Sequence, residues 1–203
     1  MKKFAIIALC IAGISILFTL LKPAQKITNY PPQGDVIVMF GDSLVAGVGA
    51  SKGGDLPSLL TAKIGQQVIN MGIPGETTSK GLERLGSVLE QNPKVVIVLL
   101  GGNDFLQRIK MVETFQNLDS IVTQIQASGA VVVLLGIRGG LVSDPYEEEF
   151  EKIAKQRGAL YVSDVLDGIF GYPELMSDSI HPNDAGYQKI ADRIIPVLKK
   201  SFK

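Results

Sequence analysis

Apolar residues along the chain gather into five short continuous runs, separated by longer segments in which apolar positions recur with a helical spacing. Short runs that are rich in β-branched side chains and bounded by turn residues are typical of strands buried on both faces of a parallel sheet. Four runs lie at residues 36–40, 95–100, 130–135 and 159–162, and the fifth is the shorter pair Val68-Ile69 within the strand predicted at 67–70. Their alternation with helical segments predicts a single α/β domain with a doubly wound parallel sheet and helices on both of its faces.

The helical segments are predicted near 55–64, from Thr77 or Thr78 to Asn92, and near 111–127, 146–157 and 183–199. The clearest of them, 111–127, places five apolar side chains on one face, those of Phe115, Leu118, Ile121, Val122 and Ile125. A stripe of this kind packs against a sheet while the opposite face meets water. Gly129 suits the position just after this helix, and Pro196 is expected to kink the final turn of the last one.

The N-terminal segment has a different pattern. Lys2 and Lys3 precede an uninterrupted apolar run from Phe4 to Leu21, which Lys22 closes. As a helix this run would span about 27 Å, which is close to the hydrocarbon thickness of a bilayer. Its length and the lack of an A-x-A cleavage site favour a retained membrane anchor over a cleaved signal peptide, although both remain open.

We therefore divide the chain into a signal or anchor at 1–26, a Pro- and Gly-containing linker at 27–34 and a globular domain at 35–203. In either reading of the first segment the domain is exported. It would lie in the periplasm or another extracytoplasmic space, tethered to the membrane where the segment is retained.

The charge of the chain argues against nucleic acid as a partner. The formal net charge is zero, but the first 26 residues hold four lysines and no acidic residue, so the remainder has 16 basic and 20 acidic side chains, a net of −4. Nucleic-acid-binding domains carry a basic patch instead. With one cysteine, Cys10, and one histidine, His181, the chain has neither an internal disulfide nor a Cys/His zinc cluster. A site made only of carboxylates is left open.

Polar residues that core packing does not require follow several of the predicted strands. Ser43 comes directly after the run 36–40, at the edge of the sheet where open α/β sheets bind their ligands. Gly72 and Asn103 follow the next two strands, and Asp178 and His181 precede the last helix. Each has an ordinary reading as a turn, cap or surface residue. Together they supply a hydroxyl nucleophile, an imidazole, a carboxylate and amide donors in the chain order of α/β-type hydrolases.

Four sequence blocks that contain these residues resemble the SGNH (GDSL) hydrolases. They are Gly41-Asp42-Ser43, Asn70-x-Gly72, Gly101-Gly102-Asn103-Asp104 and Asp178-x-x-His181-Pro182, within a resemblance that covers roughly residues 35–200. The chain looks most like the bacterial periplasmic thioesterase I, arylesterase and lysophospholipase group. The resemblance implies a flavodoxin-like three-layer α/β/α sandwich with strand order 2-1-3-4-5, and an active site that needs no cofactor or metal.

The same resemblance implies a role for each block residue. Ser43 would be the nucleophile, His181 the general base and then acid, and Asp178 the group that orients the histidine. The backbone N–H groups of Ser43 and Gly72 and the side chain of Asn103 would form the oxyanion hole. This chemistry is consistent with the residues themselves, since a serine hydroxyl needs a neighbouring base and an oxyanion needs fixed donors.

The sequence thus predicts a serine esterase that cleaves a small acyl ester, thioester or lipid through an acyl-enzyme. A carbohydrate O-acetylesterase is the enzymatic alternative, and a module that binds a phosphate-bearing ligand at the Gly-rich loop 47–54 is the non-enzymatic one. Neither the nucleophile elbow G-x-S-x-G nor a P-loop is present. The substrate-binding residues are not fixed by the sequence, although Phe105 and Leu106 would suit a groove for fatty-acyl chains.

Overall fold

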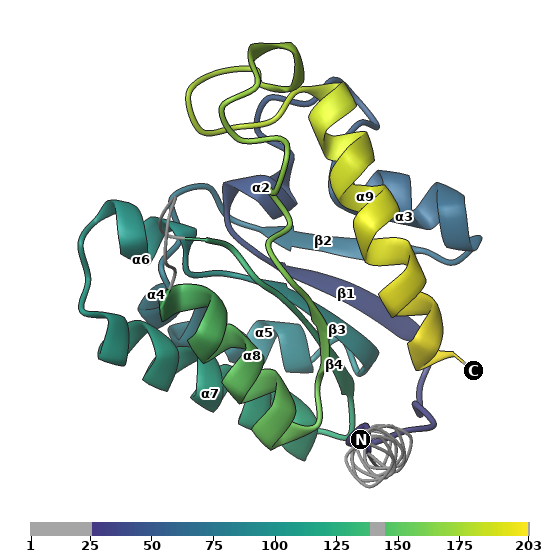
Figure 1. Cartoon of the computed structure of the whole chain (residues 1–203). Coiled ribbons are helices and arrows are strands. Elements are labelled where there is room, and N and C mark those ends of the chain that lie inside the picture. Colours follow the sequence, from purple (N-terminus) through teal and green to yellow (C-terminus); the bar gives the residue numbers. More distant parts are fainter. Residues whose placement is uncertain (1–25, 139–144, 203) are drawn as a thin grey trace, which may run out of the picture.

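The structure, a computed structural model, describes residues 26–138 and 145–202. At its centre is a parallel sheet of five strands in the order β2-β1-β3-β4-β5 (Figure 1). The strands are β1 (Val36–Gly41), β2 (Val68–Gly72), β3 (Pro93–Leu99), β4 (Val131–Leu135) and β5 (Leu160–Val162). The predicted fold class and strand order are therefore confirmed.

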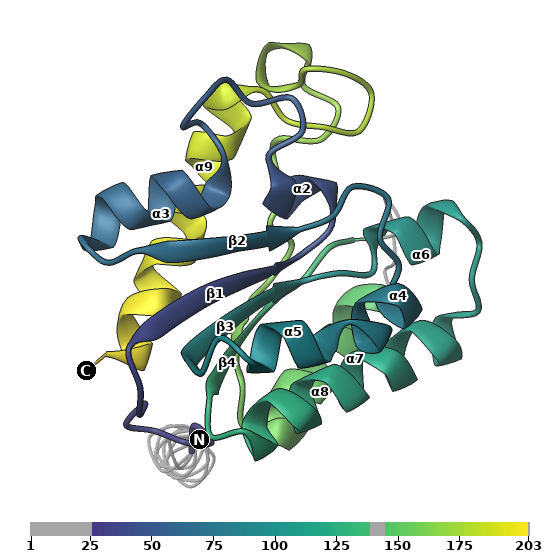
Figure 2. The ribbon, with the colours of Figure 1, turned by 180° about the vertical axis from the view of Figure 1, so that it is seen from behind.

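Helices cover both faces of the sheet and complete a three-layer sandwich (Figures 1 and 2). One layer contains α2 (Ser43–Ala46), α3 (Leu56–Ile64) and α9 (Asp184–Leu198), and the other contains α4 (Thr78–Glu83), α5 (Leu85–Leu89), α7 (Met111–Ala127) and α8 (Pro145–Arg157). The short helix α6 (Gly102–Leu106) follows β3, and the 3-10 helices η1 (Pro173–Leu175) and η2 (Lys199–Ser201) flank α9.

The central strand shows why its sequence is continuously apolar. Ile37 and Met39 of β1 belong to the core on the α3–α9 side, whereas Val38 and Phe40 belong to the core on the α7–α8 side. All four side chains are fully buried. A strand covered on both faces has no position for a polar side chain, so the alternation of exposed strands is absent.

The largest departure from the predicted elements is a break in the helix expected from Thr78 to Asn92. Arg84 leaves the helical conformation, with φ −99° and ψ 6°, and separates α4 from α5. The short helices α2 and α6 were not predicted, because four or five residues at a strand end show no periodicity. The last helix does run through Pro196 to Leu198.

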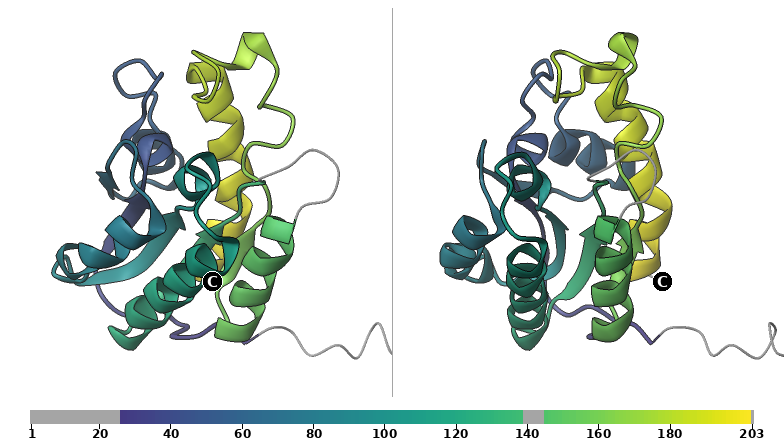
Figure 3. Two further views of the ribbon diagram at one scale, coloured as in Figure 1. Left: turned by 90° about the vertical axis from the view of Figure 1, so that its left-hand side faces the viewer. Right: turned by 60° about the vertical axis from the view of Figure 1, so that its left-hand side comes forward.

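The first described residues are bound to the base of the domain, which we define as the edge where the strands begin. Thr28 N–H donates to Gly158 O (2.9 Å) just before β5, and Asn29 Nδ2 donates to Ala130 O (2.9 Å) just before β4. Figure 3 shows this segment at the opposite end from the loop that precedes α9. The predicted anchor falls almost wholly outside the described residues, and none of the helices described between 26 and 202 is long and apolar enough to cross a membrane.

Candidate active site

The carboxyl end of β1 turns directly into α2, and this turn carries Asp42 and Ser43. The Asp42 carboxylate caps the helix by accepting a hydrogen bond from Leu44 N–H at 3.0 Å. A side chain at Gly41 is impossible without rearrangement, because a Cβ there would lie 2.2 Å from Leu99 O. The strand therefore turns sharply, which places Ser43 at the edge of the sheet where parallel strands end.

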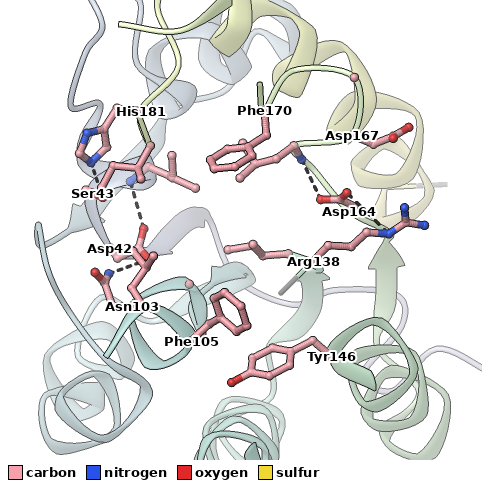
Figure 4. Close-up of a pocket in the computed structure, with 18 residues that line it drawn as sticks. Asp42, Ser43, Asn103, Phe105, Arg138, Tyr146, Asp164, Asp167, Phe170 and His181 are labelled. Atoms are coloured by element: carbon pink, nitrogen blue, oxygen red, sulfur yellow. Dashed lines mark hydrogen bonds and ion pairs between the residues drawn. The ribbon is translucent and has the colours of Figure 1, made fainter. Parts of the chain in front are cut away.

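Ser43, His181 and Asp178 form one line of contacts, although 138 residues separate the serine from the histidine. His181 Nε2 lies 3.1 Å from Ser43 Oγ (Figure 4), and His181 Nδ1 lies 2.7 Å from Asp178 Oδ2 on the other side of the ring. The loop before α9 holds this pair because Asp178 Oδ1 accepts from the N–H groups of Ile180 and His181, each at 2.8 Å. The structure thus brings together the three residues that the sequence predicted for catalysis.

The environment of Asp178 keeps its carboxylate ionised. Its hydrogen bond to the His181 ring, followed by the two backbone N–H groups, lowers its pKa from 3.8 to about 2. The Asp178 side chain is 51% exposed, whereas that of His181 is 14% exposed. A carboxylate that stays charged fixes the ring with Nδ1 as the donor, and this leaves Nε2 free to accept a proton from Ser43.

The pKa of Asp42 is shifted in the opposite direction to that of Asp178. It is buried, and desolvation raises its pKa from 3.8 to about 7 against the lowering effect of the Leu44 N–H bond. The charge of nearby Glu76 adds to the rise, while His181 and Asn103 oppose it. The sequence predicted Asp42 to be a turn or cap residue, and the Leu44 contact confirms the cap. The raised pKa of Asp42 results from its burial in the fold.

Asn103 lies at the start of α6, next to the Ser43 turn. Its Nδ2 donates to Asp42 Oδ2 at 3.1 Å (Figure 4) and to the main-chain oxygen of Glu76 at 3.0 Å. The following residue, Asp104, is buried and accepts from Thr78 N–H (2.9 Å) and Thr78 Oγ1 (2.5 Å), which ties α6 to α4. Asn103 is therefore held from two sides with its amide group beside the Ser43 turn.

A cavity of about 290 Å³ opens beside Ser43 and His181. In Figure 4 Phe170 lies on one side of it, and Phe105 and Tyr146 lie on the other, with their rings 5.6 Å apart and edge to face. The end of the cavity away from the serine is polar, because Arg138 Nε lies 3.8 Å from Asp164 Oδ2 there. Apolar side chains provide most of the remaining lining, namely Leu44, Leu106, Ile137, Leu166 and Ile180.

Comparison with known proteins agrees with this geometry. The GDSL-like Lipase/Acylhydrolase family matches residues 39–189, a range that includes the whole arrangement from the Ser43 turn to His181. The chain belongs to this family. As a GDSL-like hydrolase it is a carboxylic ester hydrolase, which confirms the family and the enzyme class expected from its four sequence blocks.

Relatives of this hydrolase are identical to it at about a third of the aligned positions. Esterase TesA of Pseudomonas aeruginosa is 31% identical over 80% of this chain and 87% of its own length. Thioesterase 1/protease 1/lysophospholipase L1 of Escherichia coli K12 is 33% identical over 78% of this chain and 80% of its own length. Among solved structures, TesA and the esterase EstA from Pseudoalteromonas sp. each superpose with a TM-score of 0.74, at 32% and 30% identity, over 82% of this chain and at least 98% of theirs.

One predicted site residue of the hydrolase, Gly72, has its N–H group engaged by a neighbouring side chain. Gly72 N–H donates to Asn70 Oδ1 at 3.0 Å, and the Cα of Gly72 packs so closely on α2 that a Cβ would lie 2.2 Å from Ala46 N. Sequence reasoning did not single out Gly75, which lies in the turn closed by Glu76 N–H to Ile73 O (3.2 Å). Gly75 has φ +78°, its N–H has no partner among the described residues, and the preceding proline marks the turn.

The hydrolase shows no metal centre within residues 26–138 and 145–202, where no group of three potential ligand side chains comes together. The Gly-rich loop 47–54 is also not arranged as a phosphate cradle. Ser51 N–H donates to the Asp184 carboxylate at 2.7 Å, and a Cβ on Gly54 would lie 2.5 Å from the same carboxylate. A negative side chain therefore occupies the position where a phosphate would need positive charge or free N–H groups.

Proposed function

We propose that this hydrolase is a serine esterase that cleaves acyl esters or thioesters through a covalent acyl-enzyme, with Ser43, His181 and Asp178 as its catalytic triad. The observation that carries the proposal is the continuous line of contacts from Ser43 Oγ to His181 (3.1 Å) and from His181 to Asp178 (2.7 Å). Nucleophile, base and orienting group in hydrogen-bond reach of one another are the geometric requirement for activating a serine.

In the proposed reaction His181 Nε2 takes the Ser43 proton while Ser43 Oγ attacks the substrate carbonyl carbon. The carbonyl oxygen becomes an oxyanion as its double bond opens. When the bond to the leaving alcohol or thiol breaks, His181 returns the proton to that group and the acyl-enzyme remains. A water molecule then attacks the acyl carbon with His181 again as base, and release of the carboxylic acid restores Ser43.

The developing oxyanion needs donors that are already in place. Ser43 N–H has no partner among the described residues, and Asn103 Nδ2 becomes available when the oxyanion replaces Asp42 Oδ2 as its acceptor. For the third donor we propose Gly75 N–H instead of Gly72 N–H. The N–H of Gly72 is engaged by Asn70, whereas the loop that carries Gly75 also carries the Glu76 oxygen that holds Asn103.

The cavity supports an acyl chain as the part of the substrate that is recognised. Its walls next to Ser43 are aromatic and aliphatic, and its volume of about 290 Å³ is more than an acetyl group would fill. The E. coli relative is a thioesterase and lysophospholipase by name, and the Pseudomonas relative an esterase. These features favour acyl ester, thioester or lipid substrates over the O-acetylated carbohydrates of the alternative prediction.

The location of the enzyme remains a proposal from the sequence of residues 1–26, which predicts export and a membrane tether. Thr28 and Asn29 are bound at the base of the sheet, whereas Ser43 lies at its carboxyl edge. A tether formed by residues 1–26 would therefore approach the domain at the end away from the active site. Substrates in the surrounding solution could then reach the cavity without passing the tether.

A fluorophosphonate probe tests the proposed mechanism directly, because it phosphonylates only an activated serine. We expect one label per chain on Ser43, seen by mass spectrometry, and loss of esterase activity in the same proportion. The Ser43→Ala variant should fold, remain unlabelled and lose activity by a factor on the order of 10⁶, as for a triad serine in subtilisin. Labelling of a folded Ser43→Ala protein, or its continued esterase activity, would disprove the triad.

A further inference from the structure

Arg84 leaves the helical path between α4 and α5, and its side chain extends to the point where β1 and β2 separate. Its Nη2 donates to Met71 O at 2.8 Å and to Gly41 O at 3.3 Å. The guanidinium carbon lies 4.5 Å from the centre of the Phe40 ring. One side chain therefore binds the last carbonyl of β1 and the next-to-last carbonyl of β2, and each of these strands leads into a different part of the proposed oxyanion hole.

Glu76 fixes Arg84 from the loop side. Its two carboxylate oxygens each lie 2.5 Å from an Arg84 nitrogen, Oε1 from Nε and Oε2 from Nη2. The Glu76 side chain is only 3% exposed and that of Arg84 20% exposed. This paired fork geometry is specific to arginine, because a lysine offers a single ammonium group in place of two parallel N–H donors.

The ion pair connects to the three parts of the site that are proposed to bind the oxyanion. Gly41 immediately precedes Asp42 and Ser43, and Met71 is the next-to-last residue of β2, which leads into the loop that carries Gly75. The main-chain oxygen of Glu76 itself accepts from Asn103 Nδ2 at 3.0 Å. A shift of Arg84 would consequently move the Ser43 turn, the 73–76 loop and the Asn103 amide relative to one another.

We propose that Arg84, locked by Glu76, is a positioning residue that sets the geometry of the oxyanion hole. The inference rests on the proposed function and adds to it a residue that neither touches the cavity nor belongs to any of the four sequence blocks. Buried ion pairs contribute little net stability in general, since desolvation offsets their attraction. Misplacement of catalytic donors by about 1 Å, by contrast, can lower a rate by a factor of about 100.

The test measures kcat and KM for a short p-nitrophenyl ester in Arg84→Met and Arg84→Lys. We expect kcat to fall by about 10–100-fold in Arg84→Met, with KM changed by less than about threefold, because substrate contacts remain while transition-state donors move. Arg84→Lys keeps the charge but not the fork, so it should fold and lose kcat by a smaller factor. Circular dichroism and thermal unfolding verify that each variant is folded.

Arg157→Met provides a matched control. Arg157 makes the same paired contact with a carboxylate, that of Asp119, at 2.7 Å and 2.5 Å, but between α7 and α8. Loss of this ion pair should leave kcat unchanged. Comparison of kcat in the Arg84 and Arg157 variants therefore separates an effect on the oxyanion hole from the general effect of removing an arginine–carboxylate ion pair.

Combination with Asn103→Ala shows whether Arg84 acts through the oxyanion hole. Asn103→Ala alone should lower kcat by roughly 10²–10³, and the double variant should lose clearly less than the product of the two single losses, because coupled residues are not additive. Full multiplicativity would overturn the inference, as would wild-type kcat in folded Arg84→Lys and Arg84→Met. Activity that survives Ser43→Ala would instead overturn the proposed function on which it rests.

Discussion

Asp42 should make the stability of this hydrolase fall as the pH rises from about 4 to about 7. In the unfolded chain the carboxyl group loses its proton near its ordinary pKa of 3.8, whereas burial in the fold delays that loss to about pH 7. Between these values unfolding releases a proton, so a higher pH favours the unfolded chain. The contribution of Asp42 is therefore complete below about pH 3.8 and is lost as the pH rises through about 7.

The size of this effect follows from the pKa difference. A change from 3.8 to about 7 is about three units, and each unit corresponds to about 1.4 kcal/mol, which gives about 4 kcal/mol between the two ends of the range. The steepest part should lose about 1.4 kcal/mol per pH unit. Screening by solvent does not reduce the estimate much, because Asp42 is only 2% exposed.

Asp42→Asn isolates this titration from those of all other groups. Urea unfolding followed by circular dichroism, at pH values from 4 to 8, gives the free energy of unfolding of the variant and of the wild type. The altered hydrogen bond to Asn103 adds an offset that does not depend on pH. We expect the difference between the two proteins to move by about 4 kcal/mol in favour of the variant as the pH rises.

Asp167→Asn serves as the control, because it removes an exposed carboxylate from the lining of the same cavity. Subtracting the pH dependence of Asp167→Asn from that of Asp42→Asn leaves the part that is specific to the buried carboxyl group. If Asp42→Asn runs parallel to the wild type, Asp42 is ionised in the folded protein and the desolvation argument fails. A difference that moves in the opposite direction would mean that the fold stabilises the Asp42 carboxylate.

Two further predictions concern the triad and the N-terminal segment. Asp178→Asn should lower kcat by less than the roughly 10⁴-fold seen for a buried triad aspartate, because water can partly replace a side chain that is 51% exposed. An unchanged kcat would exclude Asp178 from the proposed triad. A chain that begins at Lys26 should be soluble and fully active, whereas one that begins at Gln33 loses the Thr28 and Asn29 bonds and should unfold about 1–3 kcal/mol more easily in urea. Equal unfolding free energies for the two chains would refute a structural role for this segment.

The sheet could be predicted from the sequence because each central strand is covered on both faces. Residues 36–40 then have no polar positions, and the run is unmistakable against its polar surroundings. The helix break at Arg84 could not be predicted in this way, since the residues around it keep a helical spacing of apolar positions. The reason for the break is tertiary, in that the Arg84 side chain binds carbonyls of β1 and β2 and the carboxylate of Glu76.

The sequence could predict those parts of the candidate site that are side chains of a recognisable chemical type. Ser43, Asp178 and His181 are such residues, and the structure places them in contact. A backbone donor has no such signature, and the choice between Gly72 and Gly75 depends on which N–H is already bonded. The near-neutral pKa of Asp42 was equally hidden, because a cap is ordinarily exposed to solvent and this one is not.

In the proposed mechanism, the two aspartates next to Ser43 and His181 meet two different needs of the reaction. Asp178 is exposed and its pKa falls to about 2, so it is charged whenever His181 can act as a base. Asp42 is buried beside the proposed oxyanion hole, where a full negative charge would repel the oxyanion and compete with it for the Asn103 amide. Burial raises the pKa of Asp42 to about 7 and thereby limits that charge near neutral pH. Because the two carboxyl groups lie in different environments, the charged Asp178 stabilises the imidazolium in the proposed mechanism, whereas Asp42 carries less negative charge near the transition state.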